Sequence, residues 1–156
     1  MNRHTNNLIV GQGLAGTTLA WRLLDTGQSV VLVDRDEAAT ASRVSAGLVT
    51  PWTGRRMTQS DDYQEHWDEA ISFYRGIEDR LGLSLFTEQS MVRVFVNRSD
   101  EAVFQQRQQE ATSGQLEPWS GRLQENGPEI QGCRMHPAGR LDVRKYLQAS
   151  IDFFTD

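Results

Sequence analysis

The residues from Val10 to Gly16 read V-G-Q-G-L-A-G and place Gly11, Gly13 and Gly16 at the spacing Gly-x-Gly-x-x-Gly. Such a spacing allows a tight turn, a close approach of the main chain to a ligand, and close packing of a helix on a strand. The ligand that this arrangement suits is an anion, above all a pyrophosphate. Because the pattern also occurs by chance, its meaning depends on the elements around it.

An acidic residue follows at the distance that dinucleotide binding needs. Asp34 comes about 20 residues after Gly16, where a carboxylate reaches the ribose hydroxyls of an adenine dinucleotide. The same carboxylate would repel a 2′-phosphate, which disfavours NADP. The glycines and Asp34 together predict a site for NAD or FAD.

Three elements must position these residues. The apolar run Leu8–Val10 is typical of a strand that is buried on both faces, and residues 29–33 form a second run of this kind. Between them, apolar and small residues recur every three or four positions and predict a helix over residues 13–26, with its packed face formed by Gly16, Ala20, Leu23, Leu24 and Gly27.

A helix of that length can cross over between two parallel strands in the usual right-handed sense. We therefore expect a βαβ unit in which Leu14, Ala15 and Gly16 begin the helix and direct its free N–H groups and positive dipole end at the phosphates. After Asp34 come small and hydroxyl residues, then Ala-Gly-Leu-Val and Pro51. This segment predicts a loop that runs along an extended cofactor, rather than a further helix and strand.

In this segment the sequence resembles the D-amino-acid-oxidase and glycine-oxidase superfamily of FAD-dependent oxidoreductases. The similarity runs through Asp34-Arg35, Thr40-Ala41-Ser42 and Ala46-Gly47-Leu48. It implies that Asp34 binds ribose and that Arg35 lies near the adenosine. It also implies a pyrophosphate contact for Thr40, Ala41 and Ser42, and a path near the isoalloxazine for Gly47 and Leu48. Ala41 stands where a hydroxyl is often found.

A second stretch, residues 138–147, resembles the family segment in which the chain leaves the substrate domain and begins the helix that returns to the FAD domain. The resemblance implies an α/β fold: a Rossmann-like FAD-binding βαβ unit at residues 1–55, part of an α+β substrate domain at 56–140, and the start of the returning helix at 141–156.

Between these stretches, the sequence predicts further elements from periodicity and capping. We expect a helix capped by Ser60 and ended by Gly82, with the apolar stripe Tyr63, Trp67, Ala70, Tyr74, Ile77 and Leu81. A strand over 91–96 would bury Val92, Val94 and Val96, and a weaker helix capped by Ser99 would run through Ala111. Residues 115–132 are interpreted as loop with one short strand, and Asp142 as the cap of the last helix.

Two strands cannot form a parallel sheet that is buried on both faces, and the last helix runs to the end of the sequence without a stop signal. We therefore expect an N-terminal portion of a longer two-domain enzyme, inactive by itself, whose catalytic residues lie elsewhere.

Composition excludes several classes of function. There is no apolar run that could span a membrane, and a net charge of -5 without a basic stripe argues against nucleic acid as a partner.

The single cysteine, Cys133, is interpreted as a core residue and favours the reducing cytoplasm. His66 and His136 lack partners at ligand spacing, so no metal is expected, and Arg55 and Arg56 are interpreted as surface arginines.

The leading hypothesis is an FAD-dependent oxidoreductase of the D-amino-acid-oxidase type that oxidises a C–N bond of an amino acid or amine. The glycine pattern also permits an NAD-dependent dehydrogenase or a nucleotide-binding module without catalysis. Substrate identity, electron acceptor, the attachment of the flavin and oligomeric state are not specified by the sequence.

Overall fold

The computed structural model describes residues 5–35, 37, 39–112, 114–122 and 124–155, and it divides into two compact units. The first unit combines Met1–Gly47 with Asp142–Asp156, and the second unit is Leu48–Leu141. The sequence places the corresponding boundaries at 55/56 and 140/141. None of the described helices is long and apolar enough to cross a membrane.

The first unit contains a strand-helix-strand motif and two further helices. Its elements are β1 (Asn7–Val10), α1 (Leu14–Asp25), β2 (Val30–Val33), α2 (Ala41–Val44) and α5 (Val143–Thr155). The strands β1 and β2 are parallel, with Leu8 opposite Val31 and Val10 opposite Val33. The expected βαβ arrangement is therefore confirmed. The segment expected as loop contains the short helix α2, which Thr40 caps by accepting a hydrogen bond from Arg43 N.

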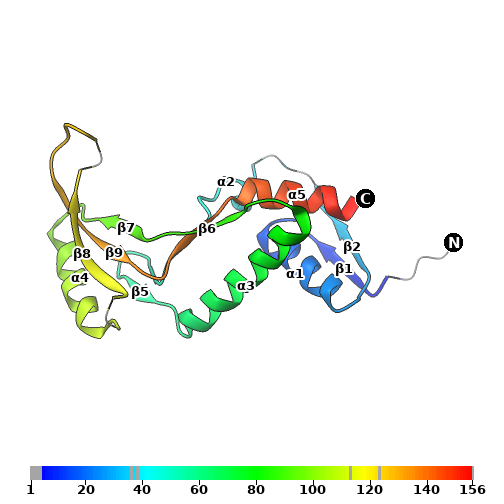
Figure 1. Cartoon of the computed structure of the whole chain (residues 1–156), viewed down its shortest axis with the longest axis horizontal. Helices are drawn as coiled ribbons and strands as arrows, with labels where there is room; N and C mark the ends of the chain where they lie inside the picture. The colour runs from blue at the N-terminus through cyan, green and yellow to red at the C-terminus, as the bar shows by residue number, and fades with distance from the viewer. Residues whose placement is uncertain (1–4, 36, 38, 113, 123, 156) are drawn as a thin grey trace. The chain divides into compact units, whose positions relative to one another are not determined.

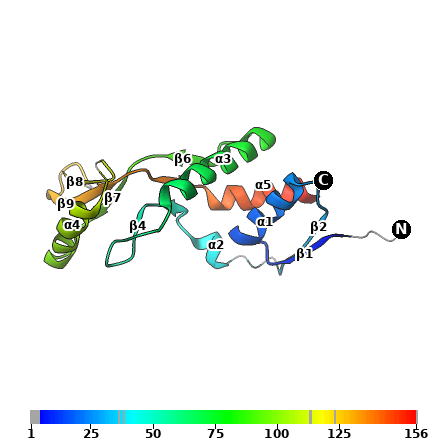
Figure 2. The same ribbon diagram turned by 90° about the horizontal axis from the view of Figure 1, so that it is seen from below.

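The helices α1 and α5 lie side by side in both views of the chain (Figure 1 and Figure 2). The indole of Trp21 in α1 is fully buried and donates from Nε1 to Ser150 Oγ in α5 at 2.9 Å, and it also contacts the rings of Phe153 and Phe154. The packed face of α1 is thus Thr17, Ala20 and Trp21. The expected face was wrong at Leu24, which is exposed, and it omitted Trp21, which is fully buried against α5.

The helices cover only one face of the two-stranded sheet. Ile9 is buried on that face, whereas Leu8, Val10, Val31 and Val33 are exposed on the other. The expectation that both faces of these strands are buried was therefore wrong for the described chain. The reason is that the described residues place no layer on the second face.

The second unit is built from antiparallel strands and two helices, as the sequence predicts for the middle of the chain. Its elements are β3 (Leu48–Val49), β4 (Trp52–Thr53), β5 (Thr58–Gln59), α3 (Tyr63–Leu81), β6 (Phe86–Glu88), β7 (Met91–Val94), α4 (Arg98–Glu110), β8 (Leu116–Gly121), β9 (Ile130–Met135) and β10 (Gly139–Leu141). One sheet has the order β3-β10-β6, another has the order β7-β9-β8, and β4 pairs with β5 in a hairpin.

The helix α3 is confirmed, but it begins later than its predicted cap. Its first residue is Tyr63, after Asp62 in the left-handed conformation, and it ends at Gly82. Ser60 does not cap it because Ser60 ends the β4–β5 hairpin, where its N–H donates to Pro51 O at 3.4 Å. The cap of α4 is likewise Asn97 rather than Ser99, since the Asn97 side chain accepts from Ser99 N and Asp100 N in a capping box.

Two predictions for the β7-β9-β8 sheet were wrong. The strand β7 turns Met91 toward a core cluster that also packs against Phe95, so Val92 and Val96 are exposed rather than buried. The residues expected as loop form most of β8 and β9. The strand β8 lies at the sheet edge, where Pro118, which lacks an N–H group, and polar side chains are tolerated.

That core cluster consists of Trp52, Met57, Phe104, Leu116, Cys133 and Met135. Cys133 is fully buried, and this burial raises the pKa of its thiol to about 11, against the opposing effect of Arg93. The interpretation of Cys133 as a core residue is confirmed.

Candidate functional site

The turn between β1 and α1 leaves no room for a side chain at Gly13 or Gly16, and Gly11 has a positive φ. Gly11 has φ of 102°, a conformation that glycine adopts without strain. A Cβ on Gly16 would overlap the carbonyl oxygen of Gly11, and a Cβ on Gly13 would lie 2.8 Å from Ser42 Oγ. These positions therefore keep the main chain of the turn bare and close-packed, as the approach of a pyrophosphate requires.

Two side chains from later segments hold the N–H groups of this turn. Asp34, directly after β2, accepts a hydrogen bond from Gln12 N at 2.5 Å, and Ser42 Oγ in α2 accepts one from Leu14 N at 3.1 Å. Both oxygens therefore lie at the N-terminal end of α1, where N–H groups and the helix dipole favour an anionic group. The donors and the bare turn fit such a group.

The predicted residues surround two hollows at the carboxyl ends of the strands. A groove of about 350 Å³ is lined by Val10, Gly11, Val33, Asp34, Arg35, Glu37 and Thr40. A second hollow of about 550 Å³ is lined by Leu8–Val10, Gly11, Gly13, Leu14, Ala15, Gly16, Leu19 and Ser42. Parallel α/β sheets bind ligands in this position, outside the carboxyl ends of their strands.

Three predicted residues lie outside these hollows. Ala41 begins α2 and is exposed, and Gly47 follows that helix with φ of 67°. Leu48 begins β3 in the second unit, where Arg140 pairs with it. Arg35 lines the groove and forms an ion pair of 3.7 Å with Glu37. Both side chains are exposed, so this ion pair contributes little energy.

The helix α5 supports the site in a way that the sequence does not predict. Asp142 caps α5 by accepting from Lys145 N at 3.1 Å, which confirms the expected cap. In the first turn of α5, Arg144 Nε donates to the carbonyl of Arg43 at 3.0 Å and so fixes α2, which carries Ser42. No local pattern could have found this contact, because its two partners lie 101 positions apart. Glu37 lines the groove of about 350 Å³ but was not among the site residues predicted from the sequence.

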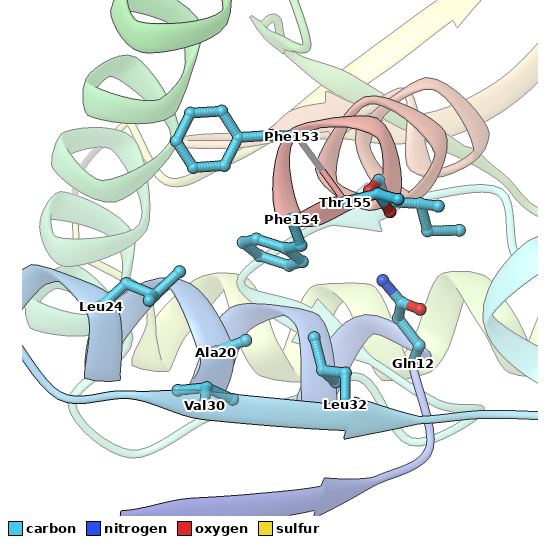
Figure 3. A pocket seen from close by; sticks show the side chains of 9 residues that line it. Gln12, Ala20, Leu24, Val30, Leu32, Phe153, Phe154 and Thr155 are labelled. Atoms are coloured by element: carbon cyan, nitrogen blue, oxygen red, sulfur yellow. The ribbon is translucent and has the colours of Figure 1, made fainter. Parts of the chain in front are cut away.

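A separate cavity of about 340 Å³ lies on the helix side of the sheet (Figure 3). It is lined by Gln12, Ala20, Leu24, Val30, Leu32, Ile151, Phe153, Phe154 and Thr155. All of these residues except Gln12 and Thr155 have apolar side chains, and the Gln12 amide lies at one end of the cavity in Figure 3. No charged side chain lines this cavity, so it lacks the groups that recognise phosphate or ribose.

Other residues that could do chemistry are dispersed. The described residues contain no group of three or more His, Cys, Asp or Glu side chains that could hold a metal ion. His66 is exposed on α3, and Arg55 and Arg56 are exposed in the turn between β4 and β5.

Comparison with solved structures shows the same fold in larger proteins. L-Amino acid deaminase from Proteus myxofaciens matches with a TM-score of 0.69 at 15% sequence identity, over 99% of this chain and 37% of that protein. Glycine oxidase from Bacillus cereus ATCC 14579 matches with a TM-score of 0.68 at 18% identity, over 96% of this chain and 44% of that protein. The predicted fold class is confirmed by these matches.

Curated proteins match over a shorter stretch. The uncharacterized oxidoreductase YurR of Bacillus subtilis (strain 168) is 42% identical over 57 residues, which is 36% of this chain and 15% of that protein. A D-amino acid dehydrogenase of Neisseria meningitidis serogroup C is 38% identical over 52 residues, 29% of this chain and 12% of that protein. The aligned stretches thus span less than a fifth of the length of these relatives.

The family model described as "FAD dependent oxidoreductase", DAO, matches residues 7–155, which include both units. The cofactor of this family is FAD, as the resemblance in the sequence implies, and the residues at the β1–α1 turn fit the diphosphate of such a cofactor. The chain belongs to the DAO family of FAD-dependent oxidoreductases.

Proposed function

We propose that this chain supplies the dinucleotide-binding part of an enzyme that oxidises a C–N bond of an amino acid or amine. The observation that carries the proposal is the geometry of the β1–α1 turn, where bare main chain meets Asp34 and Ser42 at the end of the parallel strands. The names of the structural relatives, an amino acid deaminase and a glycine oxidase, support this substrate class. A cytoplasmic location belongs to the same proposal and is supported by the single cysteine.

In this proposal each residue of the site has a defined task. Asp34 exchanges its hydrogen bond with Gln12 N for one with a ribose hydroxyl, and Arg35 lies beside the adenosine. The N–H groups at Gly13, Leu14, Ala15 and Gly16, with the hydroxyls of Thr40 and Ser42 and the main chain of Ala41, surround the pyrophosphate. Gly47 and Leu48 pass near the flavin ring.

When bound, FAD would supply the two-electron oxidant: the carbon next to the substrate nitrogen would give up a hydride and the nitrogen a proton to solvent, so that the amine becomes an imine. The chain's own residues hold the cofactor by its diphosphate and ribose, which fixes the ring relative to the substrate. No described residue is assigned as a catalytic base.

The proposal is tested on the natural polypeptide that carries this chain. The protein is purified without added cofactor and denatured, and the released chromophore is identified by absorbance and mass. We expect FAD in stoichiometric amount, and turnover of at least one member of an amino-acid and amine panel with a dye or oxygen as acceptor. Release of NAD instead, or FAD with no oxidation of any panel member, would contradict the proposal.

The variant Asp34→Ala tests the ribose contact directly. We expect FAD affinity to fall at least tenfold, because one charge-assisted hydrogen bond contributes about 1.5–3 kcal/mol. The matched control is Asp61→Ala, which removes the same charge from an exposed position in the second unit. Flavin fluorescence titration measures both, and an equal loss in the two variants would remove Asp34 from the site.

A further inference from the structure

The turn of the β4–β5 hairpin carries two adjacent arginines, Arg55 and Arg56, and both are exposed. Neither guanidinium forms a hydrogen bond or an ion pair with any residue that the structure describes. The chain has 21 acidic residues and 16 Lys and Arg residues, so carboxylates are in excess. Two arginines without partners in such a chain are therefore a feature that folding alone does not require.

The turn itself is held firmly in an unusual conformation. Gly54 and Met57 both have positive φ, 67° and 46°, and the side chain of Met57 is buried in the core cluster. Positive φ is uncommon for a residue with a side chain, and it persists only where the surroundings enforce it. The burial of Met57 supplies this constraint, so packing fixes the main-chain conformation of the turn.

Two further arginines fix the main chain of the turn from outside it. Arg93 in β7 donates from Nη1 to Gly54 O at 2.6 Å, and Arg107 in α4 donates from Nε to Arg56 O at 3.2 Å. The carbonyl oxygens of the turn are thus directed at the scaffold. Arg55 and Arg56 therefore lie on a turn that two separate elements, β7 and α4, hold in place.

The local charge is strongly positive. Four guanidinium groups belong to or contact this turn, and Glu110 is the carboxylate that pairs with one of them, Arg107, at 2.6 Å. Like charges gathered around one turn raise one another's electrostatic energy, and a bound anion would lower it. The guanidinium group is also the side chain whose planar donors match carboxylate and phosphate oxygens in pairs.

We propose that the turn of residues 54–57 is a binding site for the carboxylate or phosphate group of a small ligand, with Arg55 and Arg56 as the binding residues. Arg93 and Arg107 act as positioning residues, because they hold the main chain of the turn. The site belongs to the second unit and does not depend on the dinucleotide groove or on the activity proposed above. Its failure and the failure of the proposed function are therefore distinguishable.

Binding is measured by calorimetry and by the NMR signals of the arginine Nε–H groups, at low ionic strength, with inorganic phosphate and with succinate as probes. We expect both probes to shift the signals of Arg55 and Arg56, and we expect affinity to fall as salt is added, because screening weakens an exposed ion pair. The double variant R55Q/R56Q should lose at least tenfold in affinity. Its melting temperature should be unchanged, because the clamp on the turn uses main-chain carbonyls.

The matched control is R98Q/R122Q, which removes the same charge from two exposed arginines in the same unit. It should bind both probes as the wild type does, whereas R55K/R56K should show intermediate affinity, since lysine keeps the charge but loses the paired donors. The proposal is overturned if the wild type shows no saturable binding, or if both double variants weaken equally. Binding only to vesicles that contain phosphatidylglycerol, with none to free phosphate or succinate, would also overturn it.

Discussion

Gly16 is the residue on which the contact between α1 and the β1–α1 turn depends. Its α-carbon faces the carbonyl oxygen of Gly11, and there is no room for a Cβ at this position. We expect Gly16→Ala to lower the free energy of unfolding by about 2 kcal/mol, because main-chain atoms must shift to admit the methyl group. Urea unfolding followed by tryptophan fluorescence measures the change.

The matched control for this glycine is Gly76→Ala in α3. Nothing lies within 4 Å of a Cβ at Gly76, and the residue sits inside a helix. Alanine there should raise the free energy of unfolding by about 0.5–1 kcal/mol through helix propensity. If the two substitutions had the same sign, the close contact at Gly16 would not be the cause of its effect.

Glu78 is the buried charged residue of the described chain, and its side chain links α3 to the start of β6. Its carboxylate accepts from Leu85 N at 2.5 Å and Phe86 N at 2.8 Å, and it pairs with Arg75 at 2.6 Å. Burial raises the pKa of this carboxyl, but the two N–H donors and Arg75 outweigh burial, so that the pKa is lowered overall. The charged form therefore stabilises the fold.

A lowered pKa in the folded state has a definite effect on the pH dependence of stability. The contribution of Glu78 is fully present above its unfolded pKa of about 4.3 and is lost as the pH falls through its lower folded value. We expect Glu78→Gln to keep an acceptor for the two N–H groups and to lower the free energy of unfolding by about 1 kcal/mol at pH 7. The free energy of unfolding of the variant should then fall less steeply than that of the wild type as the pH is lowered. Urea unfolding between neutral and acidic pH measures this, and equal steepness in the two proteins would contradict it.

Arg144 connects α5 to α2 and thereby supports the helix that carries Ser42. Its guanidinium fixes the carbonyl of Arg43, next to Ser42, which accepts from Leu14 N. Under the proposed function, Arg144→Ala should weaken FAD binding about fivefold, because the lost hydrogen bond contributes about 1 kcal/mol to holding Ser42 in place. Flavin titration measures the effect, with Arg140→Ala as control, since Arg140 is an exposed arginine of β10.

Restoration of flavin affinity by a lysine at position 144, which also can donate to the carbonyl, would support the positioning role of Arg144. An equal loss in the Arg140 control would instead indicate a general effect of charge on an anionic cofactor.

The face of the β1–β2 sheet that lies opposite α1 and α5 is an exposed apolar surface of the described chain. Leu8, Val10, Val31 and Val33 are exposed by 64%, 80%, 44% and 51%, and the register of β1 and β2 places them side by side. Contiguous apolar surface of this kind is uncommon in monomeric proteins. We expect the 156-residue chain to bind the apolar dye ANS in its folded state.

The double variant V10T/V33T should reduce ANS fluorescence without loss of secondary structure, because threonine keeps the β-branched shape and adds a hydroxyl. The control V92T/V96T changes two exposed valines of the second unit. If dye binding persisted in V10T/V33T and fell in the control, the surface responsible would not be the β1–β2 face.

The features that could be predicted from the sequence are those that depend on local pattern. The spacing of Gly11, Gly13 and Gly16, the change of period after them and the acid at Asp34 predicted the βαβ unit, and the family comparison supports the same cofactor. Helix ends at Gly82 and the Asp142 cap were likewise predicted, because a cap or a terminating glycine acts within one turn of the main chain.

The burial of each face, and the later residues that support the β1–α1 turn, depend on long-range packing and could not be predicted from local pattern. Trp21 is buried because α5 returns beside α1, Met91 rather than Val92 faces the core because α4 lies on that side, and Pro118 is tolerated because β8 is an edge strand. The contacts from Ser42 to Leu14 and from Arg144 to Arg43 join residues far apart in the chain. Local periodicity reports amphipathic character, but the partner that covers a face is specified by the whole fold.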